Sequence, residues 1–189
     1  MTFDIADLED ELPEADGSID IVLCLYSVLS HLPVTSLSKV AREIARITKG
    51  QFITTVRSTG GPPTAFVEAI EAARHFELDH DLDLCKIEFH DGRRIAVRFH
   101  LFTASELRRC FADWFEIDDL CGLDIFHSRF SSDIRWHPAP IGADPKFGNL
   151  LAQLEARSMR HPGFMARATH LMLIGGRRAP TACPLQFAN

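Results

Sequence analysis

The order of apolar and polar positions predicts alternating strands and helices. Residues 19–25 form a nearly continuous apolar run after a turn, which is typical of a strand buried on both faces of a parallel sheet. The following segment has apolar residues at the spacing of one helix face, with Thr35 or Ser36 available as the cap and Lys49-Gly50 as the stop. The residues of that face are Leu37, Val40, Ala41, Ile44 and Ile47.

The same alternation continues downstream. Residues 51–56 are β-branched or aromatic and predict a second strand, and residues 64–76 predict a second helix. Later strands are predicted at 114–125 and 169–174, with a helix between them that carries Phe147, Leu150, Leu151 and Leu154. Strands and helices in this succession predict an α/β sheet.

The middle of the chain predicts a β-hairpin at residues 84–101. A two-residue turn would place Phe89 opposite Arg94 and mix charge into the apolar face. A three-residue loop, His90-Asp91-Gly92 with a left-handed Gly92, instead places Glu88 opposite Arg94. In that register one face holds Cys85, Ile87, Phe89, Ile95, Val97 and Phe99.

Two further segments carry local signals. Thr103 and Glu106 have the spacing of a capping box, and Phe102 and Leu107 have that of a hydrophobic staple, so a helix should begin here. Residues 128–146 contain three prolines and no clear period, which favours a lid or a binding loop.

Composition and charge narrow the class of protein. The 189 residues are 46% hydrophobic and 24% charged, which suits one globular domain over residues 1–178 with a polar tail at 179–189. Residues 4–20 hold eight acidic side chains and no Lys or Arg, which disfavours nucleic acid as a partner. No apolar run reaches the length of a membrane span, so no membrane association is expected. The five cysteines are odd in number and scattered, which favours reduced thiols and a cytoplasmic location.

Several segments, taken together, resemble the second half of a class I S-adenosylmethionine-dependent methyltransferase. They are ADLEDELP at 6–13, DGSIDIVL at 16–23, SHL at 30–32 and IARITKG at 44–50. The segments at 102–107 and 169–174 also look like C-terminal elements of that family. The resemblance implies a Rossmann-like sheet with an inserted hairpin, in which the strand at 19–25 lies between the family's first strand and the strand at 51–56. The first strands and the glycine-rich loop of the family should precede Asp7, and the chain looks as if it lacks them. The resemblance therefore implies methyl transfer from S-adenosylmethionine to a small-molecule acceptor that requires those missing strands.

The resemblance also implies site residues. The carboxylate of Asp7 would accept a hydrogen bond from the adenine amino group of S-adenosylmethionine, and the backbone amide of Leu8 would meet a ring nitrogen. Leu25 and Tyr26 would line the methionine end of the cofactor. Ser27 and His31 would face a small-molecule substrate, with His31 as the candidate catalytic residue that orients or deprotonates it.

Other interpretations stay open. Asp7 can be one more acid in a solvated run, and His31 can be a structural histidine satisfied by the backbone. The chain as a whole can be a non-catalytic remnant or regulatory half, or another doubly wound nucleotide binder such as a dehydrogenase. If the first strands are missing, the strand at 19–25 has an open edge, which predicts self-association or a partner chain. No metal is expected, since His80, Cys85, His90 and His100 match no recognised ligand spacing.

Overall fold

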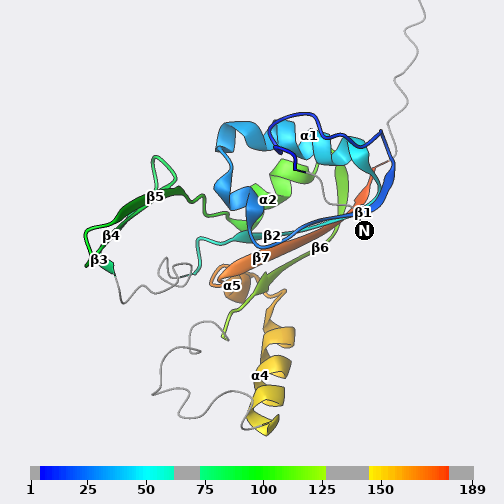
Figure 1. Ribbon diagram of the computed structural model, residues 1–189. Helices are drawn as coiled ribbons and strands as arrows, with labels where there is room; N and C mark the ends of the chain where they lie inside the picture. The colour runs from blue at the N-terminus through cyan, green and yellow to red at the C-terminus, as the bar shows by residue number, and fades with distance from the viewer. Residues whose placement is uncertain (1–4, 62–72, 127–144, 179–189) are drawn as a thin grey trace, which may run out of the picture.

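The computed structural model describes residues 5–61, 73–126 and 145–178, and contains two sheets. The larger sheet has the strand order β1-β2-β7-β6, and the smaller has the order β3-β4-β5. Helices α1 and α2 lie on one side of the larger sheet, α4 and α5 lie on the other, and the smaller sheet stands beside them (Figure 1). The described part holds no helix that is both long and apolar enough to cross a membrane.

The larger sheet confirms the predicted α/β arrangement. Its strands are β1 (Ile19–Cys24), β2 (Thr48–Arg57), β6 (Phe115–Leu123) and β7 (His170–Arg177). β1 and β2 are parallel, whereas β7 is antiparallel to both of its neighbours, β2 and β6. β1 ends the row of described strands, so the open edge expected for this strand is confirmed.

The predicted burial of β1 on both faces is wrong. Cys24 is buried and Val22 packs against the core, but Ile21 and Leu23 are 54% and 58% exposed. Successive side chains of a strand point to opposite faces, and α1 and α2 cover only the face of Val22 and Cys24 (Figure 1). The apolar run is therefore that of an interior strand, but the described chain covers only one of its faces.

Helix α1 (Leu37–Ile47) buries its predicted face, but both of its ends differ from the prediction. Neither Thr35 nor Ser36 makes a side-chain cap, since the hydroxyl of Ser36 donates to Glu9 and a 3-10 turn, η2 (Val34–Ser36), precedes the helix. At the other end the chain passes directly into β2 at Thr48, so Lys49-Gly50 lies within a strand.

Gly50 has a different reason to be glycine. A Cβ built at this position would lie 2.6 Å from the backbone oxygen of Asp20 on β1. The residue therefore permits close approach of β1 and β2.

The core lies between the larger sheet and its two helices. Phe52 of β2 is fully buried, and its ring centroid lies 4.8 Å from that of Phe111 in α2 and 5.3 Å from that of Phe115 in β6. These three rings join the centre of the sheet to α2, and α1 completes the same cluster with Ile44.

The predicted capping box is confirmed at the start of α2 (Ala104–Phe111). The Thr103 hydroxyl accepts from the Glu106 amide at 3.2 Å, and the Glu106 carboxylate accepts from the Thr103 amide at 3.4 Å. Phe102 and Leu107, the predicted staple residues, are both fully buried in the main core.

Replacing Thr103 by alanine is expected to lower the free energy of unfolding by about 1 kcal/mol, the usual cost of losing an N-cap side chain. Urea denaturation of the two proteins measures the difference. Ser38→Ala is the control, because Ser38 is an exposed residue of α1 that caps nothing. An equal loss in both variants would contradict the capping role.

The smaller sheet consists of β3 (Ala73–Asp79), β4 (Leu84–Phe89) and β5 (Arg94–Arg98). The predicted hairpin register is confirmed, since Cys85 pairs with Val97 and Glu88 with Arg94. Gly92 is left-handed with φ +85°, and the Phe89 amide donates to Arg93 O at 2.9 Å across a three-residue loop.

β3 replaces the end of the helix predicted at 64–76, which is wrong for residues 73–76 and otherwise lies outside the described residues. Ala73 pairs with Phe89 and Phe76 with Ile87, with a register irregularity between Ala73 and His75. The extra residue at this irregularity puts Ala73 and Phe76 on the same face although they are three positions apart. A bulged strand therefore has the spacing of a helix here.

The chain between β6 and β7 contains α4 (Pro145–Ser158) and α5 (Pro162–Met165). The predicted helix around 147–154 is confirmed as α4, although only Leu151 among its four predicted apolar residues is buried. The last two positions of the predicted loop at 128–146 belong to α4, and the rest of that loop and the tail at 179–189 lie outside the described residues. The division into a domain and a tail stays a prediction.

Candidate functional site at the carboxyl ends of β1 and β2

The parallel strands β1 and β2 end at the same edge of the sheet. Open α/β sheets bind ligands at the carboxyl ends of their parallel strands. Here the chain leaves β1 through Leu25, Tyr26 and Ser27 and enters the 3-10 turn η1 (Val28–His31). Four of the predicted site residues therefore lie at this edge.

The backbone after β1 is held in an unusual conformation. Tyr26 and Ser27 both have positive φ, 57° and 60°, which costs free energy for residues with a side chain. The Tyr26 side chain is 94% exposed while Ser27 is buried, so packing of the Tyr26 side chain does not explain the turn. Strain of this kind concentrates at ligand sites.

An apolar hollow of about 360 Å³ opens beside β1. It brings together Leu8, Leu25 and Tyr26 from separate parts of the chain, whereas Ser27 and His31 do not line it. Its other lining residues are Leu12, Val22, Leu23, Cys24, Val28 and Ile44. Three of the four predicted cofactor residues thus share one cavity.

Asp7, the fourth, is exposed directly before Leu8. One carboxylate oxygen of Asp7, Oδ1, accepts from the Glu9 amide at 2.9 Å and closes a local turn. The second oxygen leaves Asp7 able to accept another hydrogen bond.

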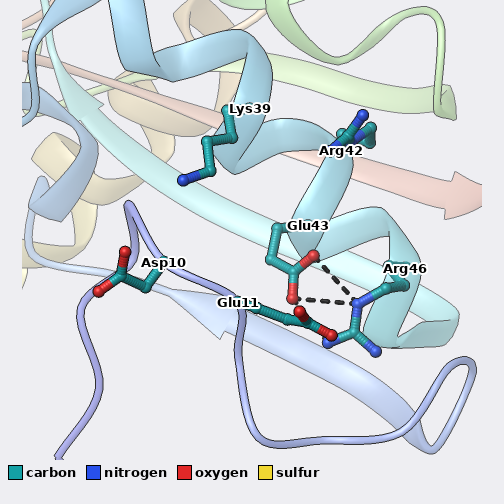
Figure 2. A pocket seen from close by; sticks show the side chains of 6 residues that line it. All are labelled: Asp10, Glu11, Lys39, Arg42, Glu43 and Arg46. Atoms are coloured by element: carbon teal, nitrogen blue, oxygen red, sulfur yellow. Dashed lines mark hydrogen bonds and ion pairs between the residues drawn. The ribbon is translucent and has the colours of Figure 1, made fainter.

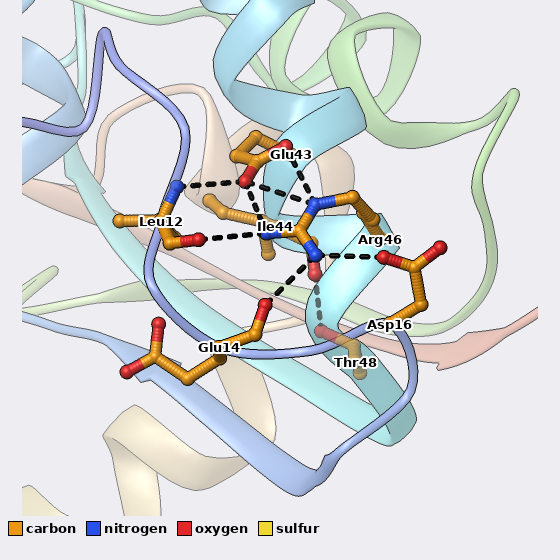
Figure 3. A network of polar contacts seen from close by, with 7 residues as sticks. All are labelled: Leu12, Glu14, Asp16, Glu43, Ile44, Arg46 and Thr48. Carbon is orange, nitrogen blue, oxygen red and sulfur yellow. Dashed lines mark hydrogen bonds and ion pairs between the residues drawn. The ribbon is translucent and has the colours of Figure 1, made fainter.

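Arg46 of α1 holds the acidic segment, residues 5–17, in place (Figure 3). Its guanidinium donates to the Asp16 carboxylate at 2.7 Å and to the carbonyls of Leu12 and Glu14 at 2.9 and 2.8 Å. Glu43 accepts from Arg46 and from the Leu12 amide, and the hydrogen bond from Arg46 lowers the pKa of Glu43. Hydrogen bonds to Glu43 and Asp16 raise the pKa of Arg46. The acidic segment is therefore a fixed wall of the hollow.

A second, polar hollow of about 550 Å³ lies beside this network (Figure 2). Its lining residues are Asp10, Glu11, Lys39, Arg42, Glu43 and Arg46. Lys39 donates to the backbone oxygen of Glu9, so α1 holds the acidic segment at a second point. Neither Arg46 nor Lys39 is recognisable from the sequence, because Asp16 and Glu9, to which they bind, are each 30 positions away.

The smaller sheet contacts the turn that follows β1 through His31, the last residue of η1. The His31 Nδ1 atom lies 2.9 Å from the carbonyl oxygen of Arg98 at the end of β5. A carbonyl only accepts, so Nδ1 carries the hydrogen and the Nε2 lone pair of the neutral ring stays available. Both interpretations of His31 are compatible with this geometry, because one nitrogen is satisfied by backbone and the other can accept a proton.

Arg57, the last residue of β2, packs against the same junction. Its amide donates to the Ser30 hydroxyl at 3.0 Å, and its carbonyl accepts from the Phe102 amide at 2.8 Å. The guanidinium carbon lies 4.3 Å from the ring centroid of Phe99, and partial burial lowers the pKa of Arg57. The end of β2 is thus fixed to η1 on one side and to the β5–α2 connection on the other.

His100 joins the two sheets. Its Nδ1 lies 2.8 Å from Asp83 in the β3–β4 turn, and its Nε2 lies 2.8 Å from Glu106 in α2. The His100 amide also donates to the Ser30 carbonyl at 2.8 Å. The capping box is the only role that the sequence predicts for Glu106, and no role is predicted for His100, because its partner Asp83 is 17 positions away.

Comparison with known proteins gives a result at the level of fold. No family model and no curated protein matches the chain. Among solved structures, the PH0226 protein of Pyrococcus horikoshii is similar with 11% identity and a TM-score of 0.53, over 92% of this chain and 57% of that one. A SAM-dependent methyltransferase from Methanosarcina mazei is similar with 14% identity and a TM-score of 0.50, over 93% of this chain and 66% of that one. The chain has the fold of class I methyltransferases.

The predicted site residues fall into two groups in the structure. Leu8, Leu25 and Tyr26 line the hollow, and Ser27 and His31 lie beyond it on the way to the smaller sheet. The chain spans 57% of the Pyrococcus horikoshii protein and 66% of the Methanosarcina mazei methyltransferase. Among the described residues, no group of three or more His, Cys, Asp or Glu is placed to hold a metal ion.

The pKa of His31 is expected below its ordinary value of about 6.5. Partial burial disfavours the charged ring and the positive charge of Arg57 acts in the same direction, while the Arg98 carbonyl opposes them. In the pH range between the lowered folded value and 6.5, the unfolded chain binds more protons at His31. The contribution of His31 to stability is therefore complete above pH 6.5 and is lost as the pH falls through its folded pKa.

NMR titration of the His31 ring in folded and urea-unfolded protein measures this difference. The folded midpoint should lie lower, and the free energy of unfolding of the wild type should fall more on acidification than that of His31→Gln. A folded midpoint equal to or above the unfolded one would show that burial does not govern this ring.

Proposed function

We propose that the chain binds S-adenosylmethionine and takes part in methyl transfer to a small-molecule acceptor. The observation that supports this best is the apolar hollow formed by Leu8, Leu25 and Tyr26 at the carboxyl edge of a methyltransferase-fold sheet. The strained turn at Tyr26 and Ser27 and the network around Arg46 both fix its walls.

The residues present fit the adenine end of the cofactor. A flat aromatic ring needs apolar walls, which the hollow supplies, and a few polar groups at its rim. The Asp7 carboxylate can accept from the exocyclic amine, and the Leu8 amide can donate to a ring nitrogen. Leu25 and Tyr26 would contact the methionine end.

S-adenosylmethionine supplies a methyl group on a sulfonium, which is already a strong electrophile. The residues of this chain then have two tasks, to align the acceptor and to receive its proton. In this proposal Ser27 and His31 position the acceptor, and the Nε2 lone pair of His31 takes the proton that the nucleophile loses. The lowered pKa of His31 keeps the ring neutral at pH 7 and therefore able to do so.

Asp7→Ala is expected to weaken binding of S-adenosylhomocysteine by about 1–3 kcal/mol, the range for a lost hydrogen bond to a charged group. NMR titration detects binding even at millimolar affinity. Two controls accompany it: Asp10→Ala removes a nearby exposed acid that does not line the apolar hollow, and His31→Ala removes the proposed acceptor-side residue. Both controls should bind like the wild type.

If Asp7→Ala binds with unchanged affinity, Asp7 belongs to a solvated acidic run. If His31→Ala loses affinity as Asp7→Ala does, the placement of His31 on the acceptor side is wrong.

A second candidate function is a non-catalytic half that binds a partner chain. The observation that favours it is β1, which ends the described sheet with Ile21 and Leu23 more than half exposed. A chain with this function would show no binding of S-adenosylhomocysteine at the hollow, so the titration separates the two candidates.

We also infer a cytoplasmic location. Cys24, Cys85, Cys110 and Cys121 are all free, and three of them are buried. Free thiols suit a reducing compartment.

A further inference from the structure

Two basic side chains, Arg57 and His31, lie close together at the carboxyl ends of β1 and β2. The guanidinium carbon of Arg57 lies 4.3 Å from the ring centroid of Phe99, and the His31 Nδ1 atom lies 2.9 Å from the carbonyl oxygen of Arg98. Arg57 and His31 are therefore held against consecutive residues at the end of β5. They are close enough that the positive charge of Arg57 contributes to the lowered pKa of His31.

An apolar surface runs along β5 from this position. Val97 and Ile95 are 38% and 43% exposed. They pair with Cys85 and Ile87 of β4, which are buried, so all four side chains belong to the apolar face of the smaller sheet. Phe99 packs in the same core cluster as Cys85 and Ile87. The exposed apolar surface therefore begins next to the ring that Arg57 contacts.

Arg57 supplies a permanent positive charge at this position. Arginine stays protonated in proteins, even though partial burial lowers the pKa of Arg57. A guanidinium donates hydrogen bonds from its edge, so the face that lies over Phe99 does not compete with them. Partial burial also strengthens the attraction of Arg57 to an anion, because less water screens the charge.

An acidic side chain, Asp124, also lies at this end of the sheet. His170 of β7 is the cross-strand partner of Arg57, and the His170 Nδ1 atom lies 3.0 Å from the Asp124 carboxylate. The Asp124 side chain is 46% exposed, and Arg57 is more buried than that. Solvent screens an exposed charge more strongly, so Arg57 dominates the charge beside Phe99.

We propose that the methyl acceptor is an apolar carboxylic acid, with its carboxylate bound by Arg57 and its apolar part packed on Val97 and Ile95. Planar guanidinium and carboxylate groups can form two parallel hydrogen bonds. A single cation suits a monocarboxylate, and it repels the ammonium group of an amine acceptor. The identity of this acid as the methyl acceptor rests on the proposed function, but its binding does not require the cofactor.

Benzoate and benzamide are matched probes, because they share a benzene ring and differ in charge. In NMR titrations of the full chain, benzoate should bind about tenfold more tightly than benzamide, as expected for a hydrogen bond to a charged group. Benzoate should also shift the amide signals of Arg57, Val97 and Phe99. Acetate should bind more weakly than benzoate, since it has no ring to pack on the apolar surface.

Arg57→Gln removes the charge and should bind benzoate no more tightly than benzamide. Arg98→Gln is the matched control, since Arg98 is exposed and alternates with Val97, so its side chain points to the other face of β5. This control should keep the preference for benzoate. S-adenosylhomocysteine is titrated into the same samples, and absence of its binding would contradict the proposed function without changing the carboxylate preference.

The proposal fails if the wild type binds benzoate and benzamide equally, because Arg57 then does not recognise a carboxylate. Equal affinity for benzoate and acetate would exclude the apolar surface from the site. A preference that persists in Arg57→Gln, or disappears in Arg98→Gln, would place the site elsewhere. If Arg57→Gln unfolds, the wild-type shifts decide alone, and shifts confined to residues away from Arg57, Val97 and Phe99 contradict the proposal.

Discussion

Replacing His100 by alanine is expected to lower the free energy of unfolding by about 2–4 kcal/mol, because two partly buried acidic side chains, Asp83 and Glu106, lose the ring that lies between them. The His100 side chain is 12% exposed and lies 2.8 Å from both Asp83 and Glu106. Without the ring, the two acidic side chains keep the cost of partial burial and lose their polar contacts with the ring nitrogens. The edge-on contact of the His100 ring with Phe102, at 4.5 Å between centroids, is lost as well.

The loss should also reach the functional site. His100 joins the β3–β4 turn to α2, and the smaller sheet contacts His31 through the Arg98 carbonyl. If the smaller sheet loosens, the His31 ring loses its remaining partial burial, and the pKa of His31 rises toward the ordinary value. Urea denaturation and an NMR titration of His31 in the same variant measure the two effects.

His90→Ala is the control for His100→Ala. His90 is exposed in the hairpin loop, so its replacement should change stability by no more than about 0.5 kcal/mol. Equal stability of His100→Ala and the wild type would contradict the bridging role. A large loss of stability with an unchanged His31 titration would confine the role to folding.

The second large effect is expected at Phe52, where replacement by alanine should cost about 3–5 kcal/mol. The ring is fully buried against Phe111 and Phe115, so its removal leaves a cavity that the sheet cannot close. Its neighbour Ile53 points to the opposite face and is only half-buried. We expect Ile53→Ala to cost about 1–2 kcal/mol, less than a fully buried residue of this size.

The pair of variants therefore measures how differently the two faces of the sheet are covered. Denaturation by urea at low protein concentration gives both values. Equal costs at Phe52 and Ile53 would mean that both faces are equally buried, and this would contradict the one-sided core.

Local signals in the sequence predicted local structure well. The hairpin register followed from one argument, that Phe89 cannot face Arg94, together with a glycine at the left-handed position 92. The start of α2 followed from Thr103 and Glu106, which interact over three residues. In both cases the residues that decide the structure are close in sequence.

Features that depend on distant partners were missed. The bulge in β3 gives Ala73 and Phe76 a helical spacing, and only pairing with β4 shows that the segment is a strand. Gly50 looked like a helix stop, but the backbone of Asp20 on β1 explains it. The exposure of Ile21 depends on what covers the sheet, which the apolar pattern of the strand does not reveal.

In the candidate site, too, short sequence segments predicted some residues, and contacts between distant positions were missed. The resemblance of short segments to a family predicted Leu8, Leu25 and Tyr26 as cofactor-binding residues. The structure places all three around one hollow. The resemblance did not reveal Arg46, which fixes the acidic segment, or the contact of Arg98 with His31, because these link residues 30 or more positions apart.

Binding of S-adenosylhomocysteine, followed residue by residue with NMR, tests the central claim most directly. We expect addition of the ligand to shift the amide signals of Leu8, Leu25 and Tyr26 together, with one common affinity. We also expect signals of the polar hollow around Arg42 to stay in place. No shifts at millimolar ligand, or shifts confined to residues away from the carboxyl ends of β1 and β2, would contradict this claim.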